Sequence, residues 1–150
     1  MSENKLDEIL DFAIAREQEA HDFYVELAEK SKHANMKEVF AGFASEELGH
    51  KHKLEAIKEG KRDFPAPKKV MDLKISNYVV DVEPGDDLDY QHVLILAMKQ
   101  EKAAFKLYTD LAASVDDEDV ASTFRALAQE EAKHKLRFEV EYDDVILIEN

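Results

Sequence analysis

Apolar residues recur at alternating steps of three and four in four stretches of the chain. This spacing places the apolar side chains on one face of an α-helix. The pattern predicts helices at about residues 5–30, 36–59, 88–113 and 118–142. Only short polar segments separate the first helix from the second and the third from the fourth. We therefore expect two antiparallel helix pairs.

The two predicted pairs are joined by a long connection, Lys61–Asp87, which contains all three prolines of the chain. Such a length is unusual for a loop inside a compact domain, but it suits a crossover that runs the length of a helix bundle. The sequence thus predicts an all-α fold, an antiparallel four-helix bundle of two helix pairs in a single domain of residues 1–150. Within the crossover, the β-branched residues 75–82 should lie extended, and residues 145–150 should form a strand-like tail.

The two halves of the chain repeat each other. A shift of 84 residues aligns them without a gap and matches several apolar, aromatic and charged positions. The matched residues are Ala13 with Ala97, Glu17 with Glu101, Tyr24 with Tyr108, Phe40 with Phe124, Glu47 with Glu131, and His50 with His134. Two similar helix pairs should pack about a pseudo-twofold axis, which would place matching residues opposite each other.

Charged residues occupy positions on the predicted core faces. The three–four spacing of each helix continues through them, and they are Glu17, Glu47, His50, Glu101, Glu131 and His134. Burying an uncompensated carboxylate costs several kcal/mol, and a domain is stable by only about 5–15 kcal/mol. No Lys or Arg lies on these faces of the predicted helices. Some other source of positive charge is therefore required.

The composition of the chain limits which source of positive charge is possible. The net charge is −14, which repels nucleic acids and anionic membranes and favours cations. The chain has no Cys, so any metal must bind to oxygen and imidazole nitrogen. Two divalent ions would neutralise four carboxylates, and a Glu and a His three residues apart on a helix can bind the same ion. We predict a dimetal site with one Glu from each of two helices and Glu-x-x-His from the other two, a known pattern of helix bundles.

Other residues near the predicted site have weaker signals. A single Glu-x-x-His on a charged helix is common, but here two occur, each 30 residues after a core glutamate. Glu46 and Glu130 lie one position off the core faces and should be solvated or contact a ligand. Tyr24 and Tyr108 could pack in the core or reach a ligand carboxylate with their hydroxyls, and both readings stay open. Four histidines without a repeated partner are expected at the surface: His21, His33, His52 and His92.

Four segments resemble the ferritin-like superfamily, and within it most closely the rubrerythrin group. They are Ala15–Tyr24, Glu46–His50, Gln100–Tyr108 and Glu130–His134, and the likeness spans about residues 5–142. The resemblance implies a diiron site in which Glu47 and Glu131 bridge the two irons. It also implies that Glu17 with His50, and Glu101 with His134, complete the separate iron shells.

The sequence departs from the rubrerythrin pattern in three ways. Full rubrerythrins carry a rubredoxin domain with four Cys, and this chain has none. Rubrerythrins also tend to have an extra Glu one turn after the ligand of the third helix, where this chain has Ala104. The remaining six-residue set is as close to that of bacterioferritin. Ferritin cages use a further short helix, however, and 16 residues follow His134, so a storage cage is the less favoured reading.

The resemblance implies an oxidoreductase that oxidises a ferrous pair with peroxide or dioxygen, with manganese or zinc as other metals that the ligands suit. Catalysis would proceed through the metals held by the six ligands, and a separate electron donor such as a rubredoxin would be needed. The alternative is an iron-binding or storage protein with ferroxidase activity. A homo-oligomer is expected; a dimer would favour redox turnover and a hollow shell would favour storage. A structural bundle with a degenerate site fits less well, because all six positions are intact.

Two further features of the sequence indicate where in the cell the protein is located. No uncharged run approaches the length of about 18 residues that a membrane span needs. The amino-terminal residues lack the apolar core of a signal peptide. We therefore expect a cytoplasmic protein without membrane or nucleic-acid partners.

Overall fold

The computed structural model describes residues 2–60, 78–79 and 90–149, and these contain four helices and no strand. The helices are α1 (Ser2–Lys30), α2 (Ala34–Gly60), α3 (Tyr90–Ser114) and α4 (Glu118–Glu149). The predicted crossover 61–87, with its extended segment 75–82, lies outside the described residues except for residues 78–79. None of the described helices is apolar over a length that could cross a membrane.

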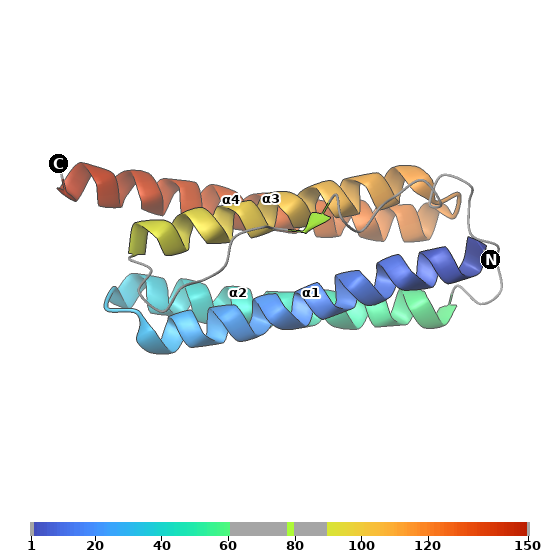
Figure 1. Ribbon diagram of the computed structural model, residues 1–150, viewed down its shortest axis with the longest axis horizontal. Coiled ribbons are helices and arrows are strands. Elements are labelled where there is room, and N and C mark those ends of the chain that lie inside the picture. Colours follow the sequence, from blue (N-terminus) through green and yellow to red (C-terminus); the bar gives the residue numbers. More distant parts are fainter. Residues whose placement is uncertain (1, 61–77, 80–89, 150) are drawn as a thin grey trace. The chain divides into compact units, whose positions relative to one another are not determined.

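The first compact unit, Met1–Met71, contains α1 and α2. The two helices lie side by side and antiparallel, as Figure 1 shows for the blue and cyan-to-green ribbons. A short turn joins them: the Ser31 amide donates to the Leu27 carbonyl oxygen at 2.9 Å, and the His33 carbonyl accepts the Met36 amide at 3.0 Å. The buried apolar side chains of these two helices are Leu6, Ile9, Leu10, Ala13, Tyr24, Met36, Phe40, Ala44 and Leu54.

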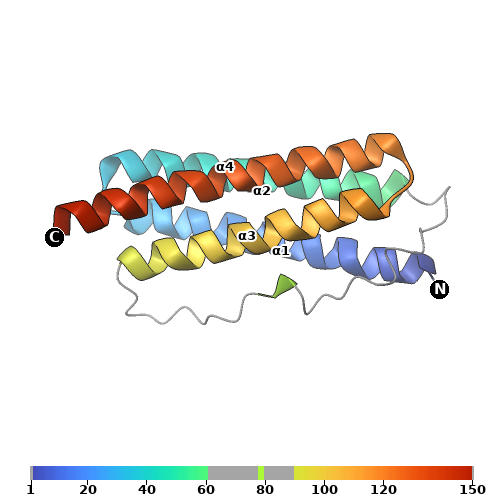
Figure 2. The ribbon, with the colours of Figure 1, turned by 90° about the horizontal axis from the view of Figure 1, so that it is seen from above.

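The second compact unit, Asp72–Asn150, contains α3 and α4, which also run antiparallel (Figure 2). Asp117 caps α4, because its Oδ1 accepts the Val120 amide at 3.0 Å and its carbonyl accepts the Ala121 amide at 2.9 Å. Acidic Glu118 and Asp119 in the first turn suit the positive end of the helix dipole. The prediction of one domain over residues 1–150 stays a prediction.

The internal repeat is visible in the packing of each unit. In the first unit the rings of Tyr24 and Phe40 stack with centroids 6.4 Å apart and planes 9° apart. In the second unit Tyr108 and Phe124 stack at 6.5 Å and 10°. Both tyrosines are at most 1% exposed. The 84-residue repeat therefore corresponds to a repeated three-dimensional packing unit.

Helix α4 continues beyond the predicted end at residue 142, and the prediction of a strand-like tail at residues 145–150 was wrong for the described part. Residues 145–149 are helical. The β-branched residues there suggested a strand, but the core spacing of α4 continues through Phe138, Glu141 and Val145. The described end of α4 contains neither Gly nor Pro to stop the helix. Tertiary packing thus outweighs the local preference for a strand.

Tyr78, within the predicted crossover, packs against α3 in the second unit. Its hydroxyl donates to Asp110 Oδ2 at 2.8 Å, and Lys106 Nζ lies 4.9 Å from the centre of its ring. Burial, together with the hydrogen bond to Asp110 and its negative charge, raises the pKa of Tyr78 well above its usual range. The Tyr78 hydroxyl therefore stays protonated and keeps this point of the connection attached to α3.

Candidate metal centre

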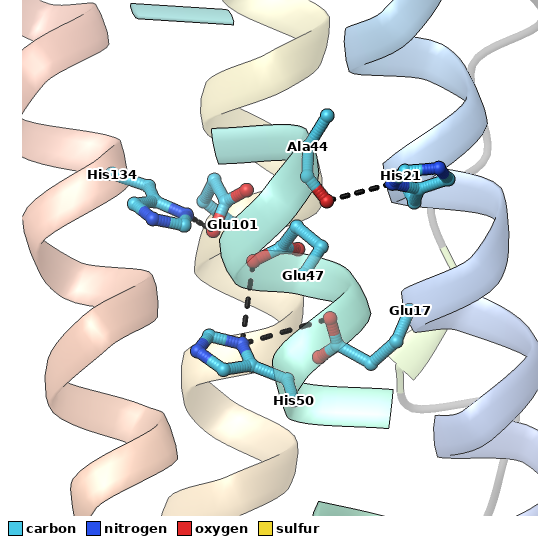
Figure 3. Close-up of polar contacts among 7 residues, drawn as sticks. All are labelled: Glu17, His21, Ala44, Glu47, His50, Glu101 and His134. Carbon is cyan, nitrogen blue, oxygen red and sulfur yellow. Dashed lines mark hydrogen bonds and ion pairs between the residues drawn. The ribbon is translucent and has the colours of Figure 1, made fainter. Parts of the chain in front are cut away.

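The first unit brings together Glu17 from α1 with Glu47 and His50 from α2, which we call the first half-site. His50 Nδ1 lies 3.7 Å from Glu17 Oε2 and 3.3 Å from Glu47 Oε1. Figure 3 shows the imidazole with this nitrogen directed at both carboxylates. Glu47 and His50 share a face of α2 because residues three apart are neighbours on a helix. All three side chains are at most 4% exposed.

The second unit forms a matching second half-site from Glu101 on α3 with Glu131 and His134 on α4. His134 Nδ1 lies 3.6 Å from Glu101 Oε2, almost the same separation as that between His50 and Glu17. The three side chains are at most 2% exposed. Each helix pair by itself thus assembles two glutamates and one histidine with the same topology. The six side chains that the sequence pattern selected fall into these two sets.

The buried charge of the two half-sites is mainly negative. Among the described residues, the buried charged side chains are five glutamates and two histidines, with no Lys or Arg. A carboxylate moved from water into a protein interior costs several kcal/mol unless a counter-charge accompanies it. Four of these glutamates belong to the half-sites. Their burial fits the binding of cations, and their oxygen and nitrogen donors suit iron, manganese or zinc.

The spacing of the donor atoms also fits metal ions. In each half-site one ligand atom from each of the three residues lies within 4.8 Å of the others. Carboxylate oxygens and imidazole nitrogens bind such metals at about 2.0–2.2 Å, so two ligands of one ion lie at most about 4.4 Å apart. Small side-chain rotations are enough to bring donor atoms that lie within 4.8 Å of one another to about 4.4 Å. Each half-site therefore offers three ligands to one ion.

The carboxylates of the first half-site control the charge of His50. Burial lowers the pKa of its imidazole, but the hydrogen bonds and negative charges of Glu17 and Glu47 outweigh burial and raise the pKa from 6.5 to about 9. Without a metal, His50 is thus an imidazolium at neutral pH and partly compensates the two acids. A metal that binds Nδ1 must displace that proton, so metal and proton compete for this nitrogen.

The raised pKa of His50 predicts a pH dependence for the stability of the metal-free protein. The pKa of His50 is raised on folding, so its stabilising effect is complete below about pH 6.5 and is lost as the pH rises through 9. The melting temperature of the metal-free protein should therefore fall more between pH 6.5 and 9.5 than that of His50→Gln. Thermal unfolding by circular dichroism in chelator-treated samples measures both. Equal pH profiles would contradict the charged state assigned to His50.

His21 differs from its expected surface position. It is partly buried, and its Nδ1–H donates to the Ala44 carbonyl oxygen of α2 at 2.7 Å (Figure 3). His21 follows Glu17 by one turn and Ala44 precedes Glu47 by one turn. The bond therefore ties α1 to α2 beside the first half-site. The other three histidines expected at the surface, His33, His52 and His92, are exposed.

The remaining predicted residues also have defined positions. Glu46 is exposed and Glu130 is intermediate in exposure, so neither is buried with the half-site ligands. Tyr24 and Tyr108 are buried in the stacked aromatic pairs, which supports core packing. Contact of their hydroxyls with a ligand stays a prediction.

One buried acid is not among the predicted site residues: Glu141 on α4, which is 6% exposed. Its Oε2 accepts a hydrogen bond from the Tyr90 hydroxyl at 2.8 Å. Burial, this bond and the charge of Glu141 raise the pKa of Tyr90 above its usual range, although Arg137 opposes the rise. Glu141 lies inside the predicted helix 118–142, and its step of three after Phe138 could have revealed it. We assign Glu141 to the contact between α3 and α4.

Two solved structures have a similar fold. A Thermotoga maritima protein described as ferritin-like and diiron-carboxylate matches with a TM-score of 0.75 and 23% identity over 91% of this chain and 93% of that one. A hypothetical protein from Pyrococcus furiosus matches with a TM-score of 0.71 and 28% identity over 92% and 88%. The comparison with curated proteins gave no significant match. The structural matches confirm the predicted all-α, ferritin-like four-helix fold class.

The sequence itself matches a family over most of its length. The Rubrerythrin family matches residues 8–142, a range that includes all six residues of the two half-sites. This range is close to the residues 5–142 over which the resemblance was recognised. The chain belongs to the rubrerythrin family.

Proposed function

We propose that this protein is a non-haem diiron oxidoreductase that acts on peroxide or dioxygen. The observation that carries the proposal is the duplicated set of two buried glutamates and one buried histidine, one set in each helix pair. Membership in the rubrerythrin family supports iron as the metal. The description of the Thermotoga relative as a diiron-carboxylate protein agrees with this choice.

In this proposal each half-site supplies ligands to one ion. Glu17, Glu47 and His50 would hold the first, and the matching residues of the second unit would hold the other. The rubrerythrin resemblance implies that Glu47 and Glu131 would each serve as a ligand of both ions. His50 and His134 would bind through Nδ1, the nitrogen that lies near a glutamate of α1 or α3 in its own unit.

The bound ions would supply the redox chemistry, since a pair of irons can bind an oxidant and give it two electrons. The residues of the chain would provide the environment of the ions. The four carboxylates balance the positive charge, and the imidazoles add neutral donors once their protons have left. The stacked pairs Tyr24–Phe40 and Tyr108–Phe124 lie two helical turns from the half-site glutamates of their own helices and are buried.

The source of electrons must lie outside the chain. It contains no Cys, so it cannot hold the Cys-ligated iron of a rubredoxin centre. We propose a separate electron donor such as a rubredoxin. Each catalytic cycle would return the two irons to the ferrous state through that partner.

Turnover and iron retention together test this function. Anaerobically iron-loaded protein is mixed with a reduced rubredoxin as donor and then with peroxide or dioxygen, and donor oxidation is followed by absorbance. We expect many equivalents of donor oxidised while two irons stay bound to each chain, with little oxidation by Glu101→Ala. Ferric iron that accumulates far beyond two per chain, without continued donor oxidation, would favour storage instead.

A further inference from the structure

The exposed charges of helix α3 are all positive. The acids of this helix are Glu101, which is buried in the second half-site, and Asp110, which is partly buried and forms an ion pair with Lys106 at 3.3 Å. The exposed charged side chains are lysines at steps of three and four, which places them on one side of the helix. They are Lys99, Lys102 and Lys106, and we call them the lysine face of α3.

The lysine face differs from the rest of a strongly acidic chain. The net charge is −14, and each of the other three helices exposes acidic side chains, for example Glu19, Glu46 and Asp143. Within the part of the chain that the structure describes, neither Lys99 nor Lys102 forms an ion pair. The positive charge of these two side chains is therefore available to an anionic partner.

The lysine face lies on the same turns of α3 as a residue of the second half-site. Glu101 and Lys102 are consecutive, and the first is buried whereas the second is exposed. Phe105 follows Glu101 by four residues and Lys102 by three, and residues at these spacings are neighbours on a helix. Phe105 is 37% exposed. An aromatic side chain thus lies between the lysine face and Glu101, and the two are no further apart than the helix diameter of about 10–12 Å.

We propose that the lysine face of α3, together with Phe105, is the docking surface for an acidic electron-donor protein. This inference rests on the proposed function, which requires a separate donor. Each encounter moves one electron: the reduced centre of the donor is oxidised, and a ferric ion at the second half-site becomes ferrous. A second encounter reduces the other ion, so two one-electron donors supply both electrons.

The charges of the chain favour an acidic protein over other anionic partners. Three lysines are too few to hold a nucleic acid or an anionic membrane against the repulsion of a net charge of −14. A small acidic protein can contact the lysine face alone, over less than about 1,200 Å², which is the range of transient electron-transfer encounters. Opposite charges steer such an encounter and are screened by salt. The complex should therefore be weak and should dissociate at high ionic strength.

Charge reversal on the lysine face tests the docking surface by binding alone. Titration calorimetry at low ionic strength measures how an acidic rubredoxin in its oxidised form binds to the iron-loaded wild type and to Lys99→Glu combined with Lys102→Glu. The oxidised donor transfers no electron, so the result does not depend on turnover. The double variant should raise the dissociation constant at least about tenfold, because two attractions become repulsions. Salt at about 0.2 M should weaken binding by the wild type and change that of the double variant little.

Lys37→Glu combined with Lys53→Glu is the matched control. Both lysines are exposed on α2, and the pair makes the same change of net charge. This control should bind the oxidised rubredoxin within about threefold of wild type. Circular dichroism confirms folding of each variant, and iron analysis confirms that the half-sites are intact. With reduced rubredoxin at low concentration, donor oxidation should be about tenfold slower in the lysine-face variant and within about threefold of wild type in the control.

The outcomes for docking and for function are separate. A wild type that binds rubredoxin through the lysine face but does not oxidise it would count against the proposed function and would support the docking surface. Turnover together with an unchanged dissociation constant in the lysine-face variant would overturn the docking surface and leave the function intact. Equal weakening by the control variant, or no binding of rubredoxin at millimolar concentration, would also overturn the docking surface.

Discussion

Replacing Glu131 by alanine is expected to reduce the iron content of the loaded protein from about two per chain to nearly zero, and Glu47→Ala should do the same. The family resemblance implies that both residues bridge the two ions. Loss of a bridge removes a ligand from each ion and leaves two close cations less well compensated in a buried site, where like charges repel strongly. Glu17→Ala and Glu101→Ala should keep at least one iron, because each would remove a ligand from one ion only. Iron per chain, measured after desalting, distinguishes the two classes.

Neighbouring acids provide matched controls for these variants. Glu46 precedes Glu47 and Glu130 precedes Glu131, but Glu46 is exposed whereas Glu47 is 1% exposed. Glu46→Ala and Glu130→Ala should therefore leave the iron content nearly unchanged. Equal loss of iron from Glu46→Ala and Glu47→Ala would show that the assigned helix face is wrong by one residue.

Removal of the metals should lower the melting temperature by more than about 15 °C. Ions that bind only the folded chain stabilise it by about 4 kcal/mol each when present at a thousand times their dissociation constant. Two sites then contribute about 8 kcal/mol, and for a chain of this length each kcal/mol is worth about 2–4 °C. The physical cause is the buried charge of the four half-site glutamates, which the bound ions would compensate. Differential scanning calorimetry of chelator-treated and reloaded protein measures the difference.

The variant Glu47→Gln distinguishes stabilisation by ions in the half-sites from stabilisation by ions that bind elsewhere on the acidic surface. Glu47→Gln removes one ligand charge with little change of shape, so it should be less sensitive to metal removal than the wild type. Equal melting temperatures of the metal-free and iron-loaded wild type would mean that the glutamates are not buried against the ions.

The sequence predicts the four helices and the six ligands because both depend on the same spacing. Glu17 continues the apolar face of the first helix, and Glu47 and His50 continue that of the second. In the structure all three are buried, as the spacing requires. The 84-residue repeat adds a second, independent prediction, which the matching Tyr24–Phe40 and Tyr108–Phe124 stacks bear out.

Other features could not be read from spacing. His21 has Phe105 at its repeated position, so the repeat gave no signal, and its bond to Ala44 depends on how α1 packs against α2. The predicted end of α4 at residue 142 is wrong, because the β-branched residues after it favour a strand although the core pattern continues at Glu141 and Val145. Only the contact of His21 depends on tertiary packing that local sequence patterns do not contain, whereas the three–four spacing of α4 does continue through Glu141 and Val145.

The proposed function requires one iron in each helix pair. Purified protein is freed of metal, loaded anaerobically with excess ferrous iron, desalted and measured for iron by atomic absorption, with protein concentration from amino-acid analysis. We expect two irons per chain for the wild type and almost none for the double variant Glu47→Ala, Glu131→Ala. A wild type that retains no iron, or a double variant that retains two, would contradict it.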